Sequence, residues 1–388
     1  GTWLVSGIIP SMIYYGLQVL SPGIFLPATL IICSVISIAT GSSWTTSATV
    51  GIALIGIGGT LGFPLGMVAG AVISGAYFGD KLSPMSDTTN LAPAMAGTDL
   101  FTHIKYMSFT TVPTYIITFI IFIILGLTVE TTGVADSSAL LADIQKAFHI
   151  TPWLFLVPVI VIGLIVKKTE PLIALFIGTL LAAVFALIFQ PEIVLMLSGE
   201  KTMNFANAYK GILNAITVES VIPTDNENLA DLFKSGGMQK MLGTIWLILC
   251  AMVFGGIMDA IGALSRISQT LLSMAKSTFG LFASTVGSCL ALNITASDQY
   301  LAIVVPGKMF KKAYHDKGLA PENLSRTLED SGTVTSVLIP WNTCGAYQSG
   351  TLGVDTFDYL PYAIFNYLSP VMTLIFAAFN IKIRQLVS

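Results

Sequence analysis

The amino-acid sequence predicts an all-α polytopic membrane protein. Of its 388 residues, 54% are hydrophobic and only 10% are charged, and the mean hydropathy is +0.80. An average soluble domain carries roughly 25% charged residues. The apolar residues form continuous runs, several of which reach the roughly 20 residues that a membrane-spanning helix needs. Because these runs do not alternate with polar residues, they favour helices over a β-barrel.

The apolar runs are distributed along the whole chain. A shorter run lies at 152–166, and the longer ones lie at 1–20, 62–79, 104–128, 171–189, 241–264 and 361–381. The segment 190–240 is polar enough to lie along the membrane surface as short amphipathic helices.

Composition argues against several other classes of protein. The net charge is -3, and no basic stripe predicts nucleic-acid binding. Cys33, Cys250, Cys289 and Cys344 lie in mostly apolar surroundings without the spacing of metal ligands, so we interpret them as small buried side chains. We expect no cofactor.

The chain resembles itself at an offset of about 250 residues. The segment "TTS" at 45–47 aligns with "TAS" at 295–297, and the acidic residue Asp80 aligns with Asp330. Ser83 aligns with Thr333 at the same offset. The apolar runs align as well, which is why we interpret the few identities as a repeat.

The repeat predicts an inverted topology. If the apolar pair at about 277–310 is a hairpin that enters and leaves on one side, the unit crosses the membrane five times, and an odd number inverts the next copy. Positions that match 152–240 would fall before residue 1, so we expect about two helices and a surface segment to be absent from this sequence. With the C-terminus inside, most Lys and Arg residues fall on the cytoplasmic side, among them Lys168 and Arg326.

Two hairpin tips concentrate polar groups between apolar arms. They are "ATGSSWTTSAT" at 39–49 and "LNITASDQY" at 292–300, and the arms look too short for two full crossings. Irregular backbone at membrane depth is tolerated only where it faces protein or a water-filled cavity. We therefore expect two re-entrant hairpins whose tips, Ser43 to Thr46 and Asn293 to Ser297, approach each other near the bilayer midplane.

Two helices are expected to be broken. In "GDKLSPMSDTT", Pro84 frees backbone carbonyls of the preceding turn. In "LEDSGTVTSVLIPWNTCG", the expected breakers are Gly332 and Pro340. Freed carbonyls, hydroxyls and a carboxylate are hard oxygen ligands, which suit Na⁺. An intramembrane Asp costs at least about 2.5–3.5 kcal/mol, so its presence points to a function.

These elements supply the candidate site residues. We expect Asp80 to carry a proton that Na⁺ displaces, with Asp87 as a ligand or second acid and Asp330 as a further coupling residue. The expected Na⁺ ligands are Thr45, Thr46, Asp80, Ser83 and Asp87, with a repeat-related cluster of Asn293, Thr295, Ser297, Asp330 and Thr333. Second-rank candidates are Lys81, Asp298, Glu329 and Asn342. The alternative interpretation of Lys81 is an ion pair with Asp80 or a side chain that reaches the membrane interface. His103 is expected at a membrane boundary or loop.

The motifs "ATGSSWTTSATVG", "GDKLSPMSDTTNLAPAMAGTDLFTHIKY" and "LNITASDQYLAIVVPGKMFKKAY" together with the second broken helix resemble the NhaC family of bacterial Na⁺/H⁺ antiporters. The resemblance implies a homodimer in the cytoplasmic membrane that works by an elevator-like alternating access. The moving part would be 22–100 and 277–352. The scaffold would be 1–21, 101–276 and 353–388.

Three functions are weighed. The first is exchange of Na⁺ for H⁺, because one carboxyl can hold either a proton or a cation. The second is exchange of a small organic acid of the malate or lactate type, or of an amino acid, with Na⁺ and H⁺, because the family also contains such members. The third is an intramembrane aspartyl protease built on Asp80 and Asp330, which the absence of a Gly-x-Gly-Asp stretch disfavours. We expect a transporter and no enzyme.

Overall fold

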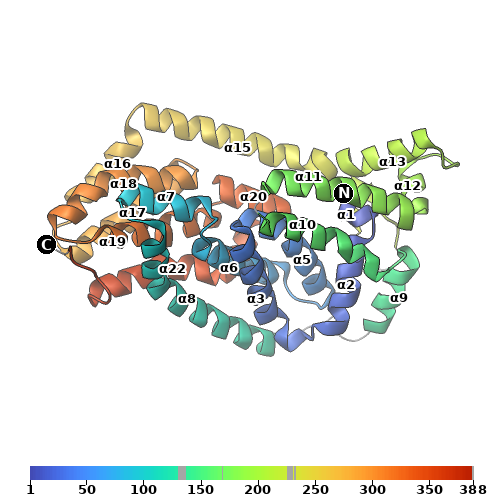
Figure 1. The fold of residues 1–388 in the computed structure, drawn as a ribbon, viewed down its shortest axis with the longest axis horizontal. Coiled ribbons are helices and arrows are strands. Elements are labelled where there is room, and N and C mark those ends of the chain that lie inside the picture. Colours follow the sequence, from blue (N-terminus) through green and yellow to red (C-terminus); the bar gives the residue numbers. More distant parts are fainter. Residues whose placement is uncertain (130–136, 168, 225–229, 231–232, 387–388) are drawn as a thin grey trace.

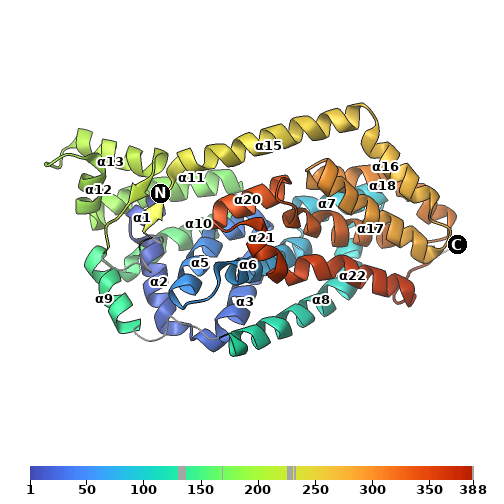
Figure 2. The same ribbon diagram turned by 180° about the vertical axis from the view of Figure 1, so that it is seen from behind.

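The computed structural model describes residues 1–129, 137–167, 169–224, 230 and 233–386, and it is built almost entirely of helices (Figures 1 and 2). Within these residues, five helices are long and apolar enough to cross a membrane, or up to seven if two bent pairs each count as one span. This confirms a mostly helical, multi-pass membrane protein. The exception to an all-α fold is a short antiparallel ladder of β1 (Ser220–Val221) and β2 (Lys234–Ser235).

The first hairpin and the first broken helix follow each other in the N-terminal part of the chain. Hairpin 1 consists of α3 (Pro22–Thr40) and the run of α4 (Ser43–Thr46), π-helical η1 (Ser47–Gly51) and α5 (Ile52–Thr60). Broken helix 1 consists of α6 (Leu65–Leu82) and α7 (Asp87–Ala96), and α8 (Leu100–Thr128) follows it.

The same order of elements recurs near the C-terminus. Hairpin 2 consists of α17 (Thr278–Thr295) and α18 (Gln299–Asp316). Broken helix 2 consists of α19 (Pro321–Leu328), π-helical η4 (Glu329–Thr333), 3₁₀-helical η5 (Ser336–Leu338) and α20 (Thr343–Leu352). It is followed by α21 (Thr356–Tyr359), η6 (Leu360–Tyr362) and α22 (Ile364–Ala378).

The boundaries of these elements recur at a constant offset of 256 residues. The N-cap residue Ser277 of α17 follows the N-cap Ser21 of α3 by 256 positions, and the same spacing relates the N-caps Asp298 and Ser42. It also relates the following pairs of caps: Ser86 and Asn342, Gly97 and Gly353, Asp99 and Asp355. The offset of about 250 was therefore wrong by six positions. At 256, Asp80 corresponds to Ser336, so Asp80 and Asp330 are not equivalent.

The two breaks have the same local cause. In broken helix 1, α6 ends at Leu82, Pro84 follows, and the Ser86 hydroxyl accepts a hydrogen bond from the backbone N–H of Thr89 at 3.4 Å as α7 begins. In broken helix 2 the side chain of Asn342 caps α20 by accepting from Cys344 N at 3.0 Å. Gly332, expected to be a breaker, instead lies within η4, where the helix widens without ending.

The remaining helices surround these units. They are α1 (Thr2–Val5), α2 (Ile8–Val19), α9 (Ser137–Ala147), η3 (Pro152–Phe155), α10 (Leu156–Val166), α11 (Pro171–Phe189), α12 (Pro191–Ser198), α13 (Phe205–Thr217), α15 (Gly237–Ala260) and α16 (Ala263–Ser273). The segment 190–240 contains the short helices α12 and α13, as its polarity suggested, although 225–229 and 231–232 lie outside the described residues. Figure 1 shows α15 lying along the outside of the molecule, where only 11% of its most apolar window is buried.

One expectation about spans was wrong. The run at 1–20 is divided into α1 and the short α2, because the chain turns at Gly7, whose φ is +81°. In each hairpin the first arm, α3 with 19 residues or α17 with 18, is long and apolar enough to cross a membrane, and the second arm is not among the described helices that meet this test. The prediction that the arms are too short for two full crossings is therefore not contradicted. Their hydroxyl groups lowered the apparent hydropathy of these arms in the sequence. Several of those hydroxyls donate to a carbonyl of the preceding turn, as Ser34 does to Leu30 at 2.7 Å.

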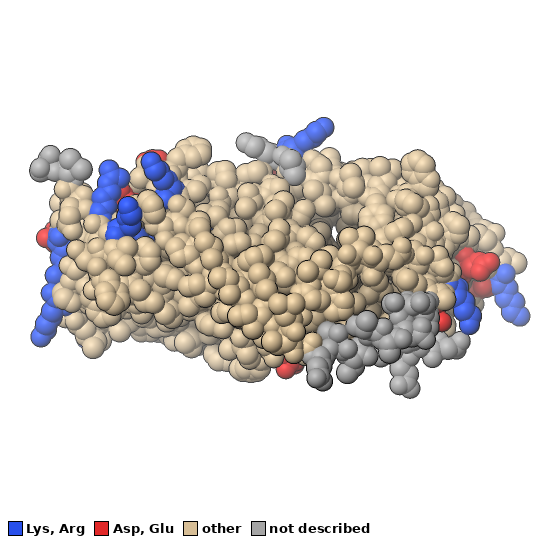
Figure 3. Space-filling view, turned by 90° about the horizontal axis from the view of Figure 1, so that it is seen from below, with Lys and Arg blue, Asp and Glu red and all other residues tan. Residues whose placement is uncertain are grey.

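Charge is distributed as expected for a protein in a bilayer. Figure 3 shows a face on which most Lys and Arg lie near the two ends of the molecule, while the broad surface between them is uncharged except for charged groups at its upper and lower edges. Lys308, Lys311, Lys312 and Lys317 are exposed at the end that carries the C-terminus. Lys168, expected on the same side, lies outside the described residues.

Helices α3 and α6 pack closely against each other. A Cβ added at Gly79 would lie 2.4 Å from the carbonyl oxygen of Ser34 and 2.6 Å from Cβ of Ser37. The Ser37 hydroxyl donates to the carbonyl of Ala76 at 2.5 Å. Because α6 ends at Asp80 to Leu82, this packing sets the position of the first break relative to hairpin 1.

Replacing Gly79 by Ala is expected to lower the stability of the protein, because a Cβ cannot fit between α6 and α3 without separating them. Overpacking of this kind costs about 1–3 kcal/mol. Gly256→Ala in α15 is the matched control, because a Cβ there meets nothing within 4 Å. The measurement is the thermal unfolding midpoint in detergent. Equal midpoints for the two variants would contradict the packing argument.

Candidate functional site

A cavity of about 690 Å³ lies where the two hairpins meet the two broken helices. Hairpin 1 lines it with residues 40–45, and hairpin 2 with Asp298, Gln299 and Tyr300. Broken helix 1 contributes Asp80, Met85, Ser86, Asp87 and Thr88, and α20 contributes Thr343 and Tyr347. The far wall comes from Ile165, Thr169, Glu170, Leu172, Leu175, Ile248 and Met252. Elements at both ends of the sequence therefore form one chamber.

The tip of hairpin 1 is built from a tight turn and a short helix. Gly41 has a φ of +68°, which favours glycine, and the turn lets the chain reverse after α3. The Ser42 hydroxyl then accepts hydrogen bonds from the backbone N–H of Thr45 at 3.2 Å and from its hydroxyl at 3.1 Å. The cap leaves the N–H of Ser43, at the start of α4, free to bind a group from another element.

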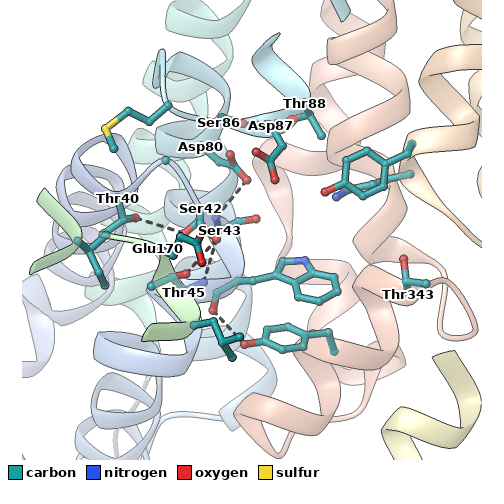
Figure 4. Close-up of a pocket in the computed structure, with 18 of the residues that line it drawn as sticks. Thr40, Ser42, Ser43, Thr45, Asp80, Ser86, Asp87, Thr88, Glu170 and Thr343 are labelled. Atoms are coloured by element: carbon teal, nitrogen blue, oxygen red, sulfur yellow. Dashed lines mark hydrogen bonds between the residues drawn. The ribbon is translucent and has the colours of Figure 1, made fainter. Parts of the chain in front are cut away.

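That group is the carboxylate of Asp80. Its Oδ2 accepts a hydrogen bond from the backbone N–H of Ser43 at 3.1 Å, and the side chain is only 9% exposed (Figure 4). Asp80 lies in the last turn of α6, two residues before the break. The bond therefore holds Asp80 at the meeting point of hairpin 1 and broken helix 1.

The cavity wall is acidic. Asp87, the first residue of α7, is exposed to the cavity and lies next to Asp80 in Figure 4. Asp298 caps α18 through Leu301 N at 3.0 Å, and Glu170 faces the cavity from the start of α11. No lysine or arginine is among the described residues that line the cavity. This charge distribution suits a cation.

Aromatic side chains close one side of the cavity. The rings of Trp44 and Tyr347 stack with centroids 4.0 Å apart and an interplanar angle of 12°. The Tyr347 hydroxyl also donates to the carbonyl of Trp44 at 3.4 Å. Because Trp44 is on hairpin 1 and Tyr347 on α20, the stack joins the two halves of the site.

The tip of hairpin 2 is tied to the second break by a network of amides. Asn342 Nδ2 donates to the backbone carbonyl of Asn293 at 3.1 Å, and Asn293 Nδ2 donates to the carbonyl of Gly332 at 2.7 Å. Ser297 adopts a left-handed φ of +59°, and its carbonyl accepts from Thr343 N at 2.9 Å. These side chains are buried and their polar groups are already paired.

Lys81 and Asp330 form a buried ion pair, and both side chains are 0% exposed. Lys81 Nζ also donates to Ser369 Oγ at 3.0 Å. The other oxygen of Asp330 accepts from the hydroxyls of Thr110, at 2.8 Å, and Thr373. The expected alternatives for Lys81, a pair with Asp80 or a side chain that reaches the interface, were both wrong, because the true partner comes from broken helix 2.

The structure brings together only part of the predicted site. Thr45, Asp80, Asp87 and Asp298 line the cavity. Thr46 and Ser83 point elsewhere, since their hydroxyls donate to the carbonyls of Ser42 at 2.9 Å and Ile38 at 2.8 Å. Thr295 donates to Ala291 within its own helix. The predicted residues that are absent from the lining are Thr46, Lys81, Ser83, Asn293, Thr295, Ser297, Glu329, Asp330, Thr333 and Asn342.

Sequence reasoning missed two buried basic residues. His103, expected at a boundary or loop, is 0% exposed within α8, where its Nδ1 lies 2.8 Å from the Ser325 hydroxyl. Arg326, assigned to the cytoplasmic side, is also 0% exposed and lies over the ring of Tyr106 at 4.8 Å. A signal was present, because Arg326 lies in one short segment with the acidic residues Glu322, Glu329 and Asp330.

Comparison with known proteins identifies the family. The model of the Na⁺/H⁺ antiporter family matches residues 75–381, which include Asp80, both breaks and hairpin 2. The chain belongs to this family. It is 39% identical to the Na⁺/H⁺ antiporter NhaC of Alkalihalophilus pseudofirmus, over 99% of this chain and 80% of that protein. The resemblance to NhaC proteins is thus confirmed.

Two relatives from Bacillus subtilis show the range of activities among similar proteins. The Na⁺/H⁺ antiporter NhaC of that organism is 36% identical, over 97% of this chain and 80% of the relative. A malate-2H⁺/Na⁺-lactate antiporter is 37% identical, over 97% of this chain and 78% of the relative. Sequence identity of this size therefore shows the family but does not show which solute the protein exchanges.

Lys81→Met alone is expected to destabilise the protein, because it leaves the Asp330 carboxylate buried without its cation. Breaking a buried pair costs about 3–5 kcal/mol. The double variant Lys81→Met with Asp330→Leu is expected to recover part of this loss. The measurement is a double-mutant cycle on thermal unfolding midpoints in detergent. Additive effects of the two substitutions would show that the pair is not coupled.

Proposed function

We propose that this protein exchanges Na⁺ for H⁺ across the cytoplasmic membrane, and that Asp80 holds the proton and the Na⁺ in turn. The observation that carries the proposal is the position of Asp80. It is a nearly buried carboxylate at a helix break, bound to the tip of hairpin 1, in an acidic cavity without a basic residue in its described lining. Its family and its NhaC relatives support the same activity.

The groups around Asp80 suit a small hard cation. Asp87 and Thr45 line the same cavity as Asp80. Carboxylate, hydroxyl and carbonyl oxygens are the ligands that such cations prefer. We therefore place Na⁺ between Asp80 and Asp87, with Thr45 as a further ligand.

Exchange follows from competition at one carboxyl group. A buried carboxylate is costly unless a proton or a cation neutralises it. Asp80 is thus protonated when Na⁺ leaves and deprotonated when Na⁺ binds. Lys81 does not neutralise it, because Asp330 and Ser369 engage its ammonium group.

The repeated elements support an alternating-access mechanism. We propose that the two units are related by an inverted topology and that they form the moving part, 22–100 and 277–352, of an elevator-type homodimer whose scaffold is 1–21, 101–276 and 353–388. The recurrence of element boundaries at 256 residues supports the repeat. The far wall of the cavity belongs to the scaffold, so movement of the two units past it would open and close the site.

Exchange of an organic solute is the second candidate. Its support is the cavity volume of about 690 Å³, which exceeds the needs of a bare Na⁺, and the similarity to a malate-2H⁺/Na⁺-lactate antiporter. Against an organic acid stands the acidic lining, whose described residues include no basic side chain that could bind a carboxylate. Proteoliposome assays of Na⁺-driven proton movement with and without malate, lactate and amino acids distinguish the two candidates.

Asp80→Asn is expected to abolish Na⁺-driven proton movement in proteoliposomes, because the amide cannot ionise. The amide oxygen can still accept from Ser43 N, so the variant should fold. Asp99→Asn is the control, since Asp99 caps α8 through Thr102 N at 2.9 Å outside the cavity, and Asn is an equally good cap. In the wild type, the apparent Na⁺ affinity should weaken as the pH falls, by about tenfold per pH unit for each proton that Na⁺ displaces. A tenfold change in affinity corresponds to about 1.4 kcal/mol.

Full exchange by Asp80→Asn would contradict the assignment of Asp80. An Na⁺ affinity that does not change with pH would contradict the competition between Na⁺ and the proton.

A further inference from the structure

The tip of hairpin 2 contributes three consecutive residues to the cavity lining that the proposed Na⁺ site does not use. They are Asp298, Gln299 and Tyr300. The Gln299 side chain is only 9% exposed, and its amide has no hydrogen-bond partner among the described residues. A nearly buried amide without a partner is costly unless a ligand or water completes its hydrogen bonds. Gln299 therefore points to a molecule in the cavity that pairs with an amide.

A carboxylate and an aromatic ring flank this amide in the chain. Asp298 caps α18 by accepting from Leu301 N at 3.0 Å, and an ionised carboxylate has acceptor sites for further donors. Tyr300 is 42% exposed, and its electrostatic neighbours include Asp87, Asp298 and Asp80. The ring thus lies among the carboxylates of the cavity. An acceptor amide, carboxylates and a ring face occur together at this tip.

Two further aromatic rings line the same cavity. Trp44 and Tyr347 stack on each other, so each ring covers one face of its partner and keeps a second face. Na⁺ is held by oxygen ligands, whereas an aromatic face attracts an organic cation through the negative charge of its π-system. A guanidinium group is planar, stacks on such faces and donates its N–H groups to carboxylate and amide oxygens in the same plane.

The charge and the size of the cavity agree with such a ligand. Four acidic residues line it, namely Asp80, Asp87, Asp298 and Glu170, and the described lining contains no lysine or arginine. One Na⁺ between Asp80 and Asp87 leaves the other two carboxylates without a counter-ion. The volume of about 690 Å³ lies within the range of small-molecule sites. The cavity therefore has room and charge for an organic cation.

We propose that the cavity binds a planar organic cation of the guanidinium class at the tip of hairpin 2, in competition with Na⁺. This inference rests on the proposed function, because both cations would use one cavity. The guanidinium N–H groups donate to the amide oxygen of Gln299 and to the carboxylate of Asp298, and the plane of the cation lies against the ring of Tyr300. Binding of one cation disfavours the other, because two like charges in one cavity repel each other.

The experiment compares two probes of nearly equal shape, methylguanidinium and methylurea. Only the first is charged, and it stays protonated at neutral pH, so it does not carry protons across the membrane as a weak base does. Na⁺-driven proton movement is measured in proteoliposomes over a range of Na⁺ concentrations with each probe. We expect methylguanidinium to raise the KM for Na⁺ without changing the maximal rate. Methylurea should inhibit at least about tenfold less strongly.

Two variants test the residues at the tip. Tyr300→Leu removes the ring, and Gln299→Leu removes the amide, so each should raise the inhibition constant of methylguanidinium at least about fivefold. The KM for Na⁺ should not change, because neither residue is in the proposed Na⁺ site. Tyr209→Leu is the matched control, since Tyr209 is 63% exposed on α13 and does not line the cavity. It should leave inhibition as in the wild type.

Three results would overturn the inference. They are equal inhibition by methylguanidinium and methylurea, inhibition that lowers the maximal rate without raising the KM for Na⁺, and unchanged inhibition in folded Tyr300→Leu and Gln299→Leu. If neither variant folds, the comparison of the two probes on the wild type decides.

Failure of the proposed function looks different, because the wild type would then show no Na⁺-driven proton movement. Calorimetric titration of the purified protein with methylguanidinium still tests the inference in that case. Binding that Tyr300→Leu weakens would support it, and an absence of binding to the wild type would overturn it.

Discussion

The hydrogen bond from the backbone of Ser43 to the carboxylate of Asp80 is the contact on which the site depends. It joins the tip of hairpin 1 to the end of α6, and the close packing of Gly79 against Ser34 brings these two elements into register. The break at Pro84 ends α6 at this point, so Asp87 starts a new helix beside Asp80. Hairpin 2 and α20 complete the chamber, and the stack of Trp44 on Tyr347 joins α20 to hairpin 1.

Four buried charged residues on the two broken helices fall into two groups with different consequences. Lys81 and Asp330 neutralise each other and have their remaining polar atoms paired, so they form a structural link between the two broken helices. Asp80 and Glu329 have no such partner. A buried carboxylate in this position needs a proton or a cation, and that requirement is the physical basis of coupled exchange. The distinction depends on geometry, because the sequence does not show which of these four charged residues form a pair.

Sequence alone predicted the membrane class, the family, both helix breaks and the two polar tips, because each of these leaves a local signal such as Pro84 or a run of hydroxyl residues. It did not give the partner of Lys81, since the 249 positions to Asp330 carry no local signal. It misplaced the repeat by six positions because few residues are identical between the copies, whereas helix caps such as Ser86 and Asn342 mark the correct offset only once the helices are seen. It also assigned Arg326 to the cytoplasmic side and His103 to a membrane boundary or loop, and it missed their burial because burial of a basic residue is decided by tertiary packing.

Proton release on Na⁺ binding tests the central claim most directly. Purified protein in weakly buffered detergent solution receives Na⁺, with choline as the control cation, and the change in pH is recorded beside the amount of Na⁺ bound. The account predicts acidification that follows Na⁺ binding in the wild type and neither binding nor release in Asp80→Asn. Equal Na⁺ binding and proton release in the wild type and in Asp80→Asn would contradict it.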